Sequence, residues 1–285
     1  MKLLGALKIM FFGRLRNFIE DTILTSPHFG KRQPLRTDKP SFTSDLKCLK
    51  ENGYCTLGKI LCEEEISQIK KKITSLCKNN KVAFFNNTSN YIQFNKPLLI
   101  HPAFTRIATN PYILDLIETY FNRVCYLADV DARRIYAYDV NEIEKKVGYS
   151  SSNWHKDSRG RQLKLMIYLT DVNSNDSNFS FIPGTHIPFF PRSKNNVYRF
   201  SDADANQMEN EPIEWLGKAG EACLFDTNLI HRLRRKKTAS IRDSFTFYFT
   251  PGQELRHLDL GLSELNKNKI FSEPENTLFR PRIKY

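Results

Sequence analysis

The sequence predicts a mainly β fold, a barrel or jelly roll preceded by helices, within a chain of 285 residues. Two observations lead to this prediction. Before about residue 124 apolar residues recur at helical spacing, whereas afterwards short apolar or alternating runs are separated by turn-rich segments. Many short strands bounded by turns are typical of an all-β sandwich or barrel. The 21 Phe and 12 Tyr residues also favour strands.

The first 24 residues, MKLLGALKIMFFGRLRNFIEDTIL, have apolar side chains at helical spacing, interrupted by Lys8, Arg14 and Arg16. The longest apolar run is too short to span a bilayer. Lys8 also interrupts the apolar region that a signal peptide would need. Two alternatives stay open: a basic amphipathic helix on a membrane surface, or a helix packed on the domain.

The next segment, residues 26–43, is rich in Pro and basic residues and is typical of a linker or extended arm. We therefore predict two parts. Residues 1–43 form an N-terminal amphipathic helix and a basic linker, and residues 44–285 form the folded domain.

Residues 49–77, LKENGYCTLGKILCEEEISQIKKKITSLC, predict the end of a helix, a turn at Gly53, a short strand and a second helix. Glu63, Glu64 and Glu65 fall in the first turn of that second helix, where the helix dipole favours acidic side chains. The segment NPYILDLIETYFN predicts a further helix with Pro111 near its start.

Six short segments after this helix are the expected strands. They read VCYLADV (124–130), RRIYAYDV (133–140), LKLMIYLTDV (163–172), FSFIPG (179–184), EACLFD (221–226) and SFTFYFT (244–250). Gly220 and Glu221 predict a turn that opens the fifth of them. This strand leads up to His231.

The formal net charge is +12 and the sequence pI is about 9.4. Nucleic acid, an anionic membrane surface or an anionic substrate could each account for such a charge, as could a basic surface without a partner. No RNA-recognition, zinc-finger or helix-turn-helix signature accompanies it, so nucleic acid ranks lowest. The six cysteines form no CxxC pair and no secreted disulfide framework. This pattern predicts a reducing, cytoplasmic location, with peripheral membrane contact as the open alternative.

The segment SNWHKDS places His155 and Asp157 two residues apart, so on a strand both side chains point to the same face. A His-x-Asp pair alone is a weak signal, since a second one begins at His257. Only the first is followed by further histidines in distinctive settings, His186 and His231, and Arg242 lies eleven residues beyond His231. Two histidines and a carboxylate can form one face of an octahedral iron site and leave the other face open. An arginine can bind the far end of a dicarboxylate through its planar fork.

The ordered set RRIYAYDV…SSNWHKD…LKLMIYLTDVN…FIPGTH…GEACLFDTNLIH…R resembles the phytanoyl-CoA dioxygenase-like family of Fe(II)/2-oxoglutarate-dependent oxygenases, over residues 45–250 or so. The resemblance implies a double-stranded β-helix (a cupin-like jelly roll) with N-terminal helices against one sheet. It implies that His155, Asp157 and His231 ligate Fe(II) and that Arg242 binds the distal carboxylate of 2-oxoglutarate. Ser244, two residues after Arg242, is expected to share its strand face and add a hydrogen bond to that carboxylate.

The chain departs from the family pattern in two places. Family members often have a glycine-proline pair before the PGTH-like turn, where this chain has Asp176, Ser177 and Asn178. They often carry small polar residues after the distal histidine, whereas this chain has five basic residues at 232–237. Neither departure removes a ligand. The basic run is expected either as a solvated loop or as an anion or headgroup contact near the mouth of the site.

Other residues near these motifs have less specific expected roles. Tyr136, Tyr138 and Lys164 are candidates for the pocket wall, although parity alone does not say which face looks inward. Trp154 is expected in the core, and His186 is expected mainly to stabilise the PGTH turn.

These observations predict a dioxygenase that uses Fe(II), O2 and 2-oxoglutarate to hydroxylate a C–H bond of a small or lipid-linked, anionic substrate. Because Asp157 is intact, hydroxylation is favoured over halogenation, for which a small residue replaces the carboxylate. Two alternatives stay open: a non-catalytic membrane-surface binding module with a vestigial metal site, and a macromolecule hydroxylase.

Overall fold

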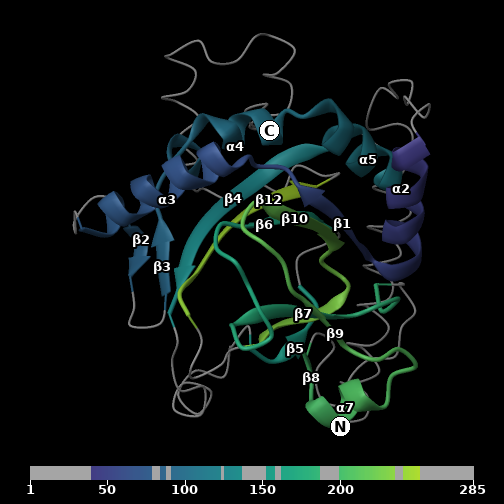
Figure 1. The fold of residues 1–285 in the computed structure, drawn as a ribbon. Helices are drawn as coiled ribbons and strands as arrows, with labels where there is room; N and C mark the ends of the chain where they lie inside the picture. Colours follow the sequence, from purple (N-terminus) through teal and green to yellow (C-terminus); the bar gives the residue numbers. More distant parts are fainter. Residues whose placement is uncertain are drawn as a thin grey trace, which may run out of the picture.

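The computed structural model describes residues 40–78, 84–87, 91–122, 125–136, 152–157, 162–186, 199–234 and 240–250. The helix predicted for residues 1–24 lies outside these ranges, so it stays a prediction. No helix within the described ranges has the length and apolar character needed to cross a bilayer. Helices, a large sheet and a small sheet form successive layers (Figure 1).

The helical layer is built mainly from the first part of the chain, as the sequence predicts. Its elements are α2 (Pro40–Asn52), α3 (Glu63–Lys78), the short 3-10 helix η2 (Pro97–Leu99), α4 (Pro102–Ala108) and α5 (Pro111–Phe121). The predicted turn is confirmed, because Gly53 ends α2 with φ +80° and leads into β1 (Tyr54–Lys59). The predicted boundary at residue 43 falls inside α2, and the division into two parts itself stays a prediction.

The large sheet has seven antiparallel strands in the order β1-β10-β6-β12-β4-β3-β2. The strands added to β1 are β10 (Glu221–Asp226), β6 (Leu163–Tyr168), β12 (Arg242–Thr250), β4 (Tyr126–Ile135), β3 (Tyr91–Phe94) and β2 (Phe84–Asn87). Two runs that the sequence separates, 124–130 and 133–140, contribute residues 126–130 and 133–135 to the single strand β4. The reason is that β4 pairs with β12 along its whole length.

The small sheet has the order β8-β5-β11-β7-β9. Its strands are β8 (Arg199–Phe200), β5 (Trp154–His155), β11 (Ile230–Arg234), β7 (Asn178–Ile182) and β9 (Ile213–Trp215), and α7 (Asp202–Asn206) follows β8. From β4 to β7 and from β9 to β12, successive main strands alternate between the large and the small sheet. This alternation is the double-stranded β-helix, a cupin-like jelly roll, and it confirms the predicted fold.

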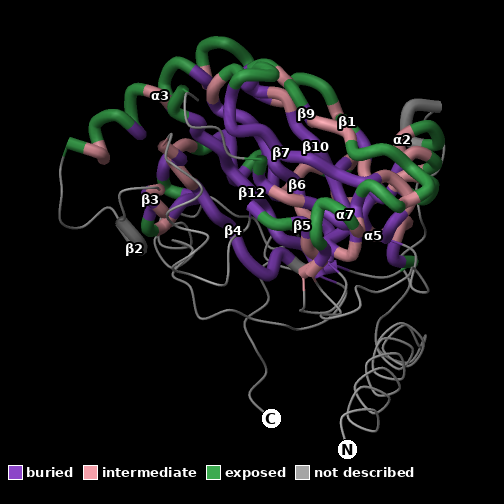
Figure 2. Tube along the Cα trace, turned by 90° about the horizontal axis from the view of Figure 1, so that it is seen from below, coloured by how far each residue is buried: buried purple, intermediate pink, exposed green. Residues whose placement is uncertain are grey.

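Strand alternation gives the large sheet two different faces. Its outer face packs against the helices, where Phe104 of α4 stacks on Phe245 of β12 with ring centroids 3.7 Å apart. Its inner face looks toward the small sheet, where Tyr168 of β6 stacks on Trp215 of β9 at 4.0 Å. Figure 2 shows the central strands buried along most of their length. The large sheet is therefore buried on both faces, and the side chains of its inner face lie between the two sheets.

Candidate metal centre

The structure brings together the three residues that the sequence selects as ligands. His155 ends β5 and His231 is the second residue of β11, and the antiparallel register places them directly opposite each other. Asp157 follows β5, and its backbone N–H donates to the carbonyl of Thr227 at 3.0 Å, just before β11 begins. Pairing of β5 with β11 thus joins ligands that are 76 residues apart in the sequence.

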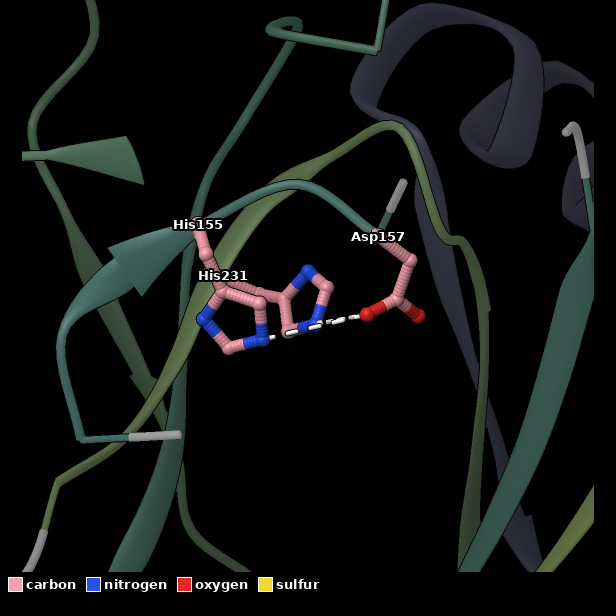
Figure 3. Close-up of side chains that lie close together, drawn as sticks. All are labelled: His155, Asp157 and His231. Carbon is pink, nitrogen blue, oxygen red and sulfur yellow. Dashed lines mark ion pairs between the residues drawn. The ribbon is translucent and has the colours of Figure 1, made fainter. Parts of the chain in front are cut away.

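Both histidine rings are oriented by backbone carbonyls. Nδ1 of His155 lies 2.7 Å from the carbonyl oxygen of Asn153, and Nδ1 of His231 lies 2.7 Å from that of Leu229. Since a carbonyl only accepts, each Nδ1 carries the hydrogen and each Nε2 keeps a lone pair. Both Nε2 atoms lie 3.8 Å from Oδ1 of Asp157 (Figure 3).

The three ligand atoms lie within 4.8 Å of one another. Two imidazole nitrogens and one carboxylate oxygen are the donor set of a non-haem Fe(II) site. The residues present therefore fit the metal that the sequence predicts.

The protonation states also suit a metal. Burial, and after it the charge of the nearby His155, lowers the pKa of His231 to about 3. Burial likewise lowers the pKa of His155. For Asp157, burial raises the pKa, but the charge of Lys164 and then the histidines outweigh it, so the pKa lies below its usual value. At neutral pH the centre has neutral imidazoles and a charged carboxylate, which is the state that ligation requires.

Lys164 on β6 fixes the orientation of the Asp157 carboxylate. Its Nζ lies 2.5 Å from Oδ2 of Asp157, so that oxygen is engaged while Oδ1 faces the histidines. The ammonium also lies over the ring of Tyr248 at 4.9 Å and that of Phe225 at 6.0 Å. The sequence names Lys164 only as a candidate for the pocket wall. Its pairing with a ligand depends on tertiary contact.

The outer side of the small sheet holds β5 against β11. Arg232 lies over the ring of Trp154 at 4.1 Å. Asp202 of α7 accepts from Trp154 Nε1 at 3.0 Å and from Arg232 Nη1 at 2.6 Å. Trp154 is a core residue, as predicted. Arg232 and Arg234, however, lie within β11 and not in a solvated loop, because β11 pairs with β7. The Arg234 side chain forms an ion pair with Glu214.

Arg242 is the first residue of β12 and is only 4% exposed. Its Nη1 donates to the carbonyl of Ser177 at 3.2 Å, and its guanidinium lies 5.8 Å from the ring of Tyr168. Its buried Nε has no hydrogen-bond partner. Within the described part of the chain no carboxylate pairs with Arg242. A buried, uncompensated guanidinium is costly, so this position fits an anionic ligand.

The loop that departs from the family pattern supports Arg242. Asp176 Oδ1 accepts from the backbone N–H of Ser240 at 3.2 Å and from its hydroxyl at 2.6 Å. The carbonyl of Ser177, next in the loop, accepts from Arg242. Asp176 and Ser177, which stand where family members often have a glycine-proline pair, therefore connect the segment before β7 to the start of β12.

The remaining predicted residues have varied outcomes. Ser244 is buried on the same face as Arg242, and its contact with a carboxylate stays a prediction. Of the candidates for the pocket wall, Tyr136 packs against the core under the helices and therefore does not line the pocket. His186 Nε2 lies 3.0 Å from the carbonyl of Lys50, a structural role as predicted. Tyr138 and His257 lie outside the described residues.

Comparisons with known proteins agree with this geometry. The family model described as phytanoyl-CoA dioxygenase (PhyH) matches residues 49–244. No curated protein sequence matches significantly.

Several solved structures share the fold, among them the following three. The epimerase SnoN in complex with Fe3+, alpha ketoglutarate and nogalamycin RO has a TM-score of 0.54 at 15% identity, covering 74% of this chain and 83% of its own. HygX from Streptomyces hygroscopicus with nickel, 2-oxoglutarate and hygromycin B bound has a TM-score of 0.54 at 19% identity, and the match covers 76% of this chain and 90% of HygX. EctD from S. alaskensis in its apoform has a TM-score of 0.55 at 16% identity, and the match covers 77% of this chain and 80% of EctD.

Proposed function

The chain belongs to the phytanoyl-CoA dioxygenase family, and from this premise we propose that it hydroxylates a C–H bond of a small or lipid-linked, anionic substrate with Fe(II), O2 and 2-oxoglutarate. The observation that carries the proposal is the convergence of His155, Asp157 and His231. Two Nε2 lone pairs and one carboxylate oxygen face a common point. Solved relatives of the same fold contain iron or nickel together with the co-substrate, which supports the choice of cofactor.

The residues of the candidate site divide the work of this reaction between metal binding and co-substrate binding. His155, Asp157 and His231 would hold the metal through three donor atoms, fewer than Fe(II) takes, so the co-substrate and O2 could also reach it. Arg242 binds the distal carboxylate of 2-oxoglutarate, which supplies the negative charge that its buried guanidinium lacks. Bound iron supplies the oxidising chemistry. The overall reaction converts O2, 2-oxoglutarate and a C–H bond into succinate, CO2 and an alcohol.

The test is succinate release by the purified protein in the presence of Fe(II), 2-oxoglutarate and O2. We expect slow release without a prime substrate, and no release when iron, the co-substrate or O2 is omitted. Binding of Fe(II) without succinate release under any condition would instead indicate a non-catalytic module with a vestigial metal site.

The proposal of an anionic substrate rests on the net charge of the protein. The net charge of +12 favours an anionic partner in solution or at a membrane. For residues 1–24 two proposals stay open, a helix packed on the domain and an interfacial helix, and the second can be tested directly. Sedimentation with anionic and neutral vesicles tests it, and equal recovery of full-length and truncated protein with both would contradict it.

A further inference from the structure

A continuous line of side chains leads along the inner face of the large sheet away from the metal ligands. It begins with Asp157 and Lys164, whose ammonium lies over the ring of Tyr248. Burial raises the pKa of the Tyr248 phenol, and the charge of Asp131 adds to this rise while Arg133 opposes it. Strand register places Asp129 opposite Tyr248 and Arg133 opposite Ser244, so Asp129, Asp131 and Arg133 lie on the same inner face as Tyr248. The line therefore continues from β12 onto β4.

Arg133 ends this line in an unusual setting. Strand register places it opposite Ser244, on the same inner face as Arg242. Its Nε forms an ion pair with Asp131, which orients the guanidinium. Yet 40% of the Arg133 side chain is exposed, against 2% for His231. Among the described residues nothing accepts a hydrogen bond from its two terminal nitrogens, so an oriented pair of donors faces solvent.

The neighbouring strand β3 extends this polar surface. Gln93 is the register partner of Arg133, so it lies on the same face. It is half-buried, and its side-chain amide makes no hydrogen bond within the described part of the chain. The ring of Tyr91 lies 5.7 Å from the Arg133 guanidinium. The inner face of β3 and β4 thus combines guanidinium donors, an amide and an aromatic ring, and a bare acyl chain would leave the donors and the amide without partners.

We propose that Arg133, with Gln93 and Tyr91 beside it, binds the polar part of the prime substrate through two neighbouring oxygen acceptors, either a carboxylate or adjacent sugar hydroxyls. This inference rests on the proposed function. A substrate must place its reacting C–H bond at the metal, and the line from Asp157 to Arg133 is where the rest of that molecule finds partners.

Charge compensation separates this site from that of the co-substrate. Arg133 is paired with Asp131, whereas no described carboxylate neutralises Arg242. The doubly charged 2-oxoglutarate therefore belongs at the uncompensated arginine. The compensated, exposed arginine of β4 suits a group that needs directed hydrogen bonds more than charge.

The experiment uses the full chain loaded with Fe(II) and 2-oxoglutarate in the absence of O2. Glucuronate, glucose, acetate and octanoate are titrated, and calorimetry and the visible absorption of the iron complex report binding. We expect glucuronate to bind more tightly than octanoate. Arg133→Gln should weaken glucuronate about tenfold or more, equivalent to about 1.4 kcal/mol, while Arg133→Lys should weaken it less. The glucose and acetate arms show whether hydroxyls or the carboxylate provide the acceptors.

Controls keep this test separate from the test of the proposed function. Gln93→Ala, which disturbs no buried charge, should weaken glucuronate about threefold, as for a neutral hydrogen bond. Arg106→Gln removes an equal charge from an exposed pair with Glu65 on the helical side and should change nothing. The Kd of 2-oxoglutarate should stay within about twofold in Arg133→Gln, well below the loss expected for an arginine that binds it.

Three outcomes would overturn the inference while leaving the dioxygenase assignment intact. These are unchanged glucuronate binding in Arg133→Gln, tighter binding of octanoate than of every polar probe, and a loss of 2-oxoglutarate affinity in Arg133→Gln as large as in Arg242→Leu. Failure of the wild-type protein to bind 2-oxoglutarate would contradict the proposed function itself.

Discussion

The two faces of β12 are equally buried but chemically opposite. All nine residues from Arg242 to Thr250 are buried. On the outer face Phe245, Phe247 and Phe249 join the core beneath the helices. On the inner face Arg242 and Tyr248 look toward the small sheet, which carries His155 and His231. Burial by itself therefore does not identify functional residues in this fold. A buried charge that no described group compensates, such as that of Arg242, is the better indicator of a functional residue.

This comparison predicts that inner-face substitutions change chemistry, whereas outer-face substitutions change stability. The largest effect is expected on the small sheet, at the ligands themselves. His155→Ala or His231→Ala should reduce Fe(II) binding and succinate release to background, because each removes one of only three protein ligands. Iron binding, succinate assays and circular dichroism measure this. Substantial turnover in either variant with an unchanged spectrum would contradict the ligand assignment, and His257→Ala is the control expected to stay active.

On the outer face, Phe247→Ala should lower the free energy of unfolding by about 3–5 kcal/mol, because the fully buried ring leaves a cavity among its aromatic neighbours. The Kd for 2-oxoglutarate, measured where the variant is still folded, should not change. Denaturant titration and calorimetry give the two numbers. Loss of co-substrate affinity in the folded variant would show that the faces are not independent.

On the inner face, Arg242→Leu should do the reverse. The KM for 2-oxoglutarate should rise by an amount equivalent to about 2–4 kcal/mol, because a charge-assisted contact in a buried site is lost. Stability without co-substrate should not fall, since the substitution removes a buried charge that lacks a described counter-ion. Arg242→Lys should recover only part of the affinity, because an ammonium has no planar fork. An unchanged KM in both variants would reassign the anchor.

The smallest effect is expected at Lys164, which contacts the carboxylate of Asp157, a proposed ligand. Lys164→Met should release Oδ2 of Asp157, which can then take a coordination position that the co-substrate needs. Fe(II) binding should persist while activity falls about 10- to 100-fold, the range for residues that orient a ligand. Binding of 2-oxoglutarate to the iron-loaded protein should weaken in parallel.

Lys218→Met is the matched control for Lys164→Met. Lys218 also pairs with an aspartate, Asp171, but 68% of its side chain is exposed. It should behave as wild type, because an exposed pair contributes little. Equal co-substrate binding in wild-type protein and Lys164→Met would remove the orienting role.

Much of the molecule could be predicted from the sequence because the relevant signals are local or periodic. Pro111 at the start of α5 and Gly53 at the end of α2 are start and stop signals that act within one turn. The two-residue spacing of His155 and Asp157 and the strand before His231 selected the ligands, since few sequences combine these features in that order. The jelly roll followed from many short strands and from the family resemblance.

Only the tertiary structure decided which strand faces meet. Alternation states that Arg133 and Arg134 point to opposite sides of β4, but not which side looks toward the metal. The structure places Arg133 on the inward face. It places Arg134 on the outward face, in an ion pair with Asp243. Tyr136 packs against the core beneath the helices. Likewise, Lys164 meets Asp157, and Arg232 covers Trp154, only through pairing between distant strands. Register sets such contacts, and register depends on how two whole sheets bury their surfaces against each other.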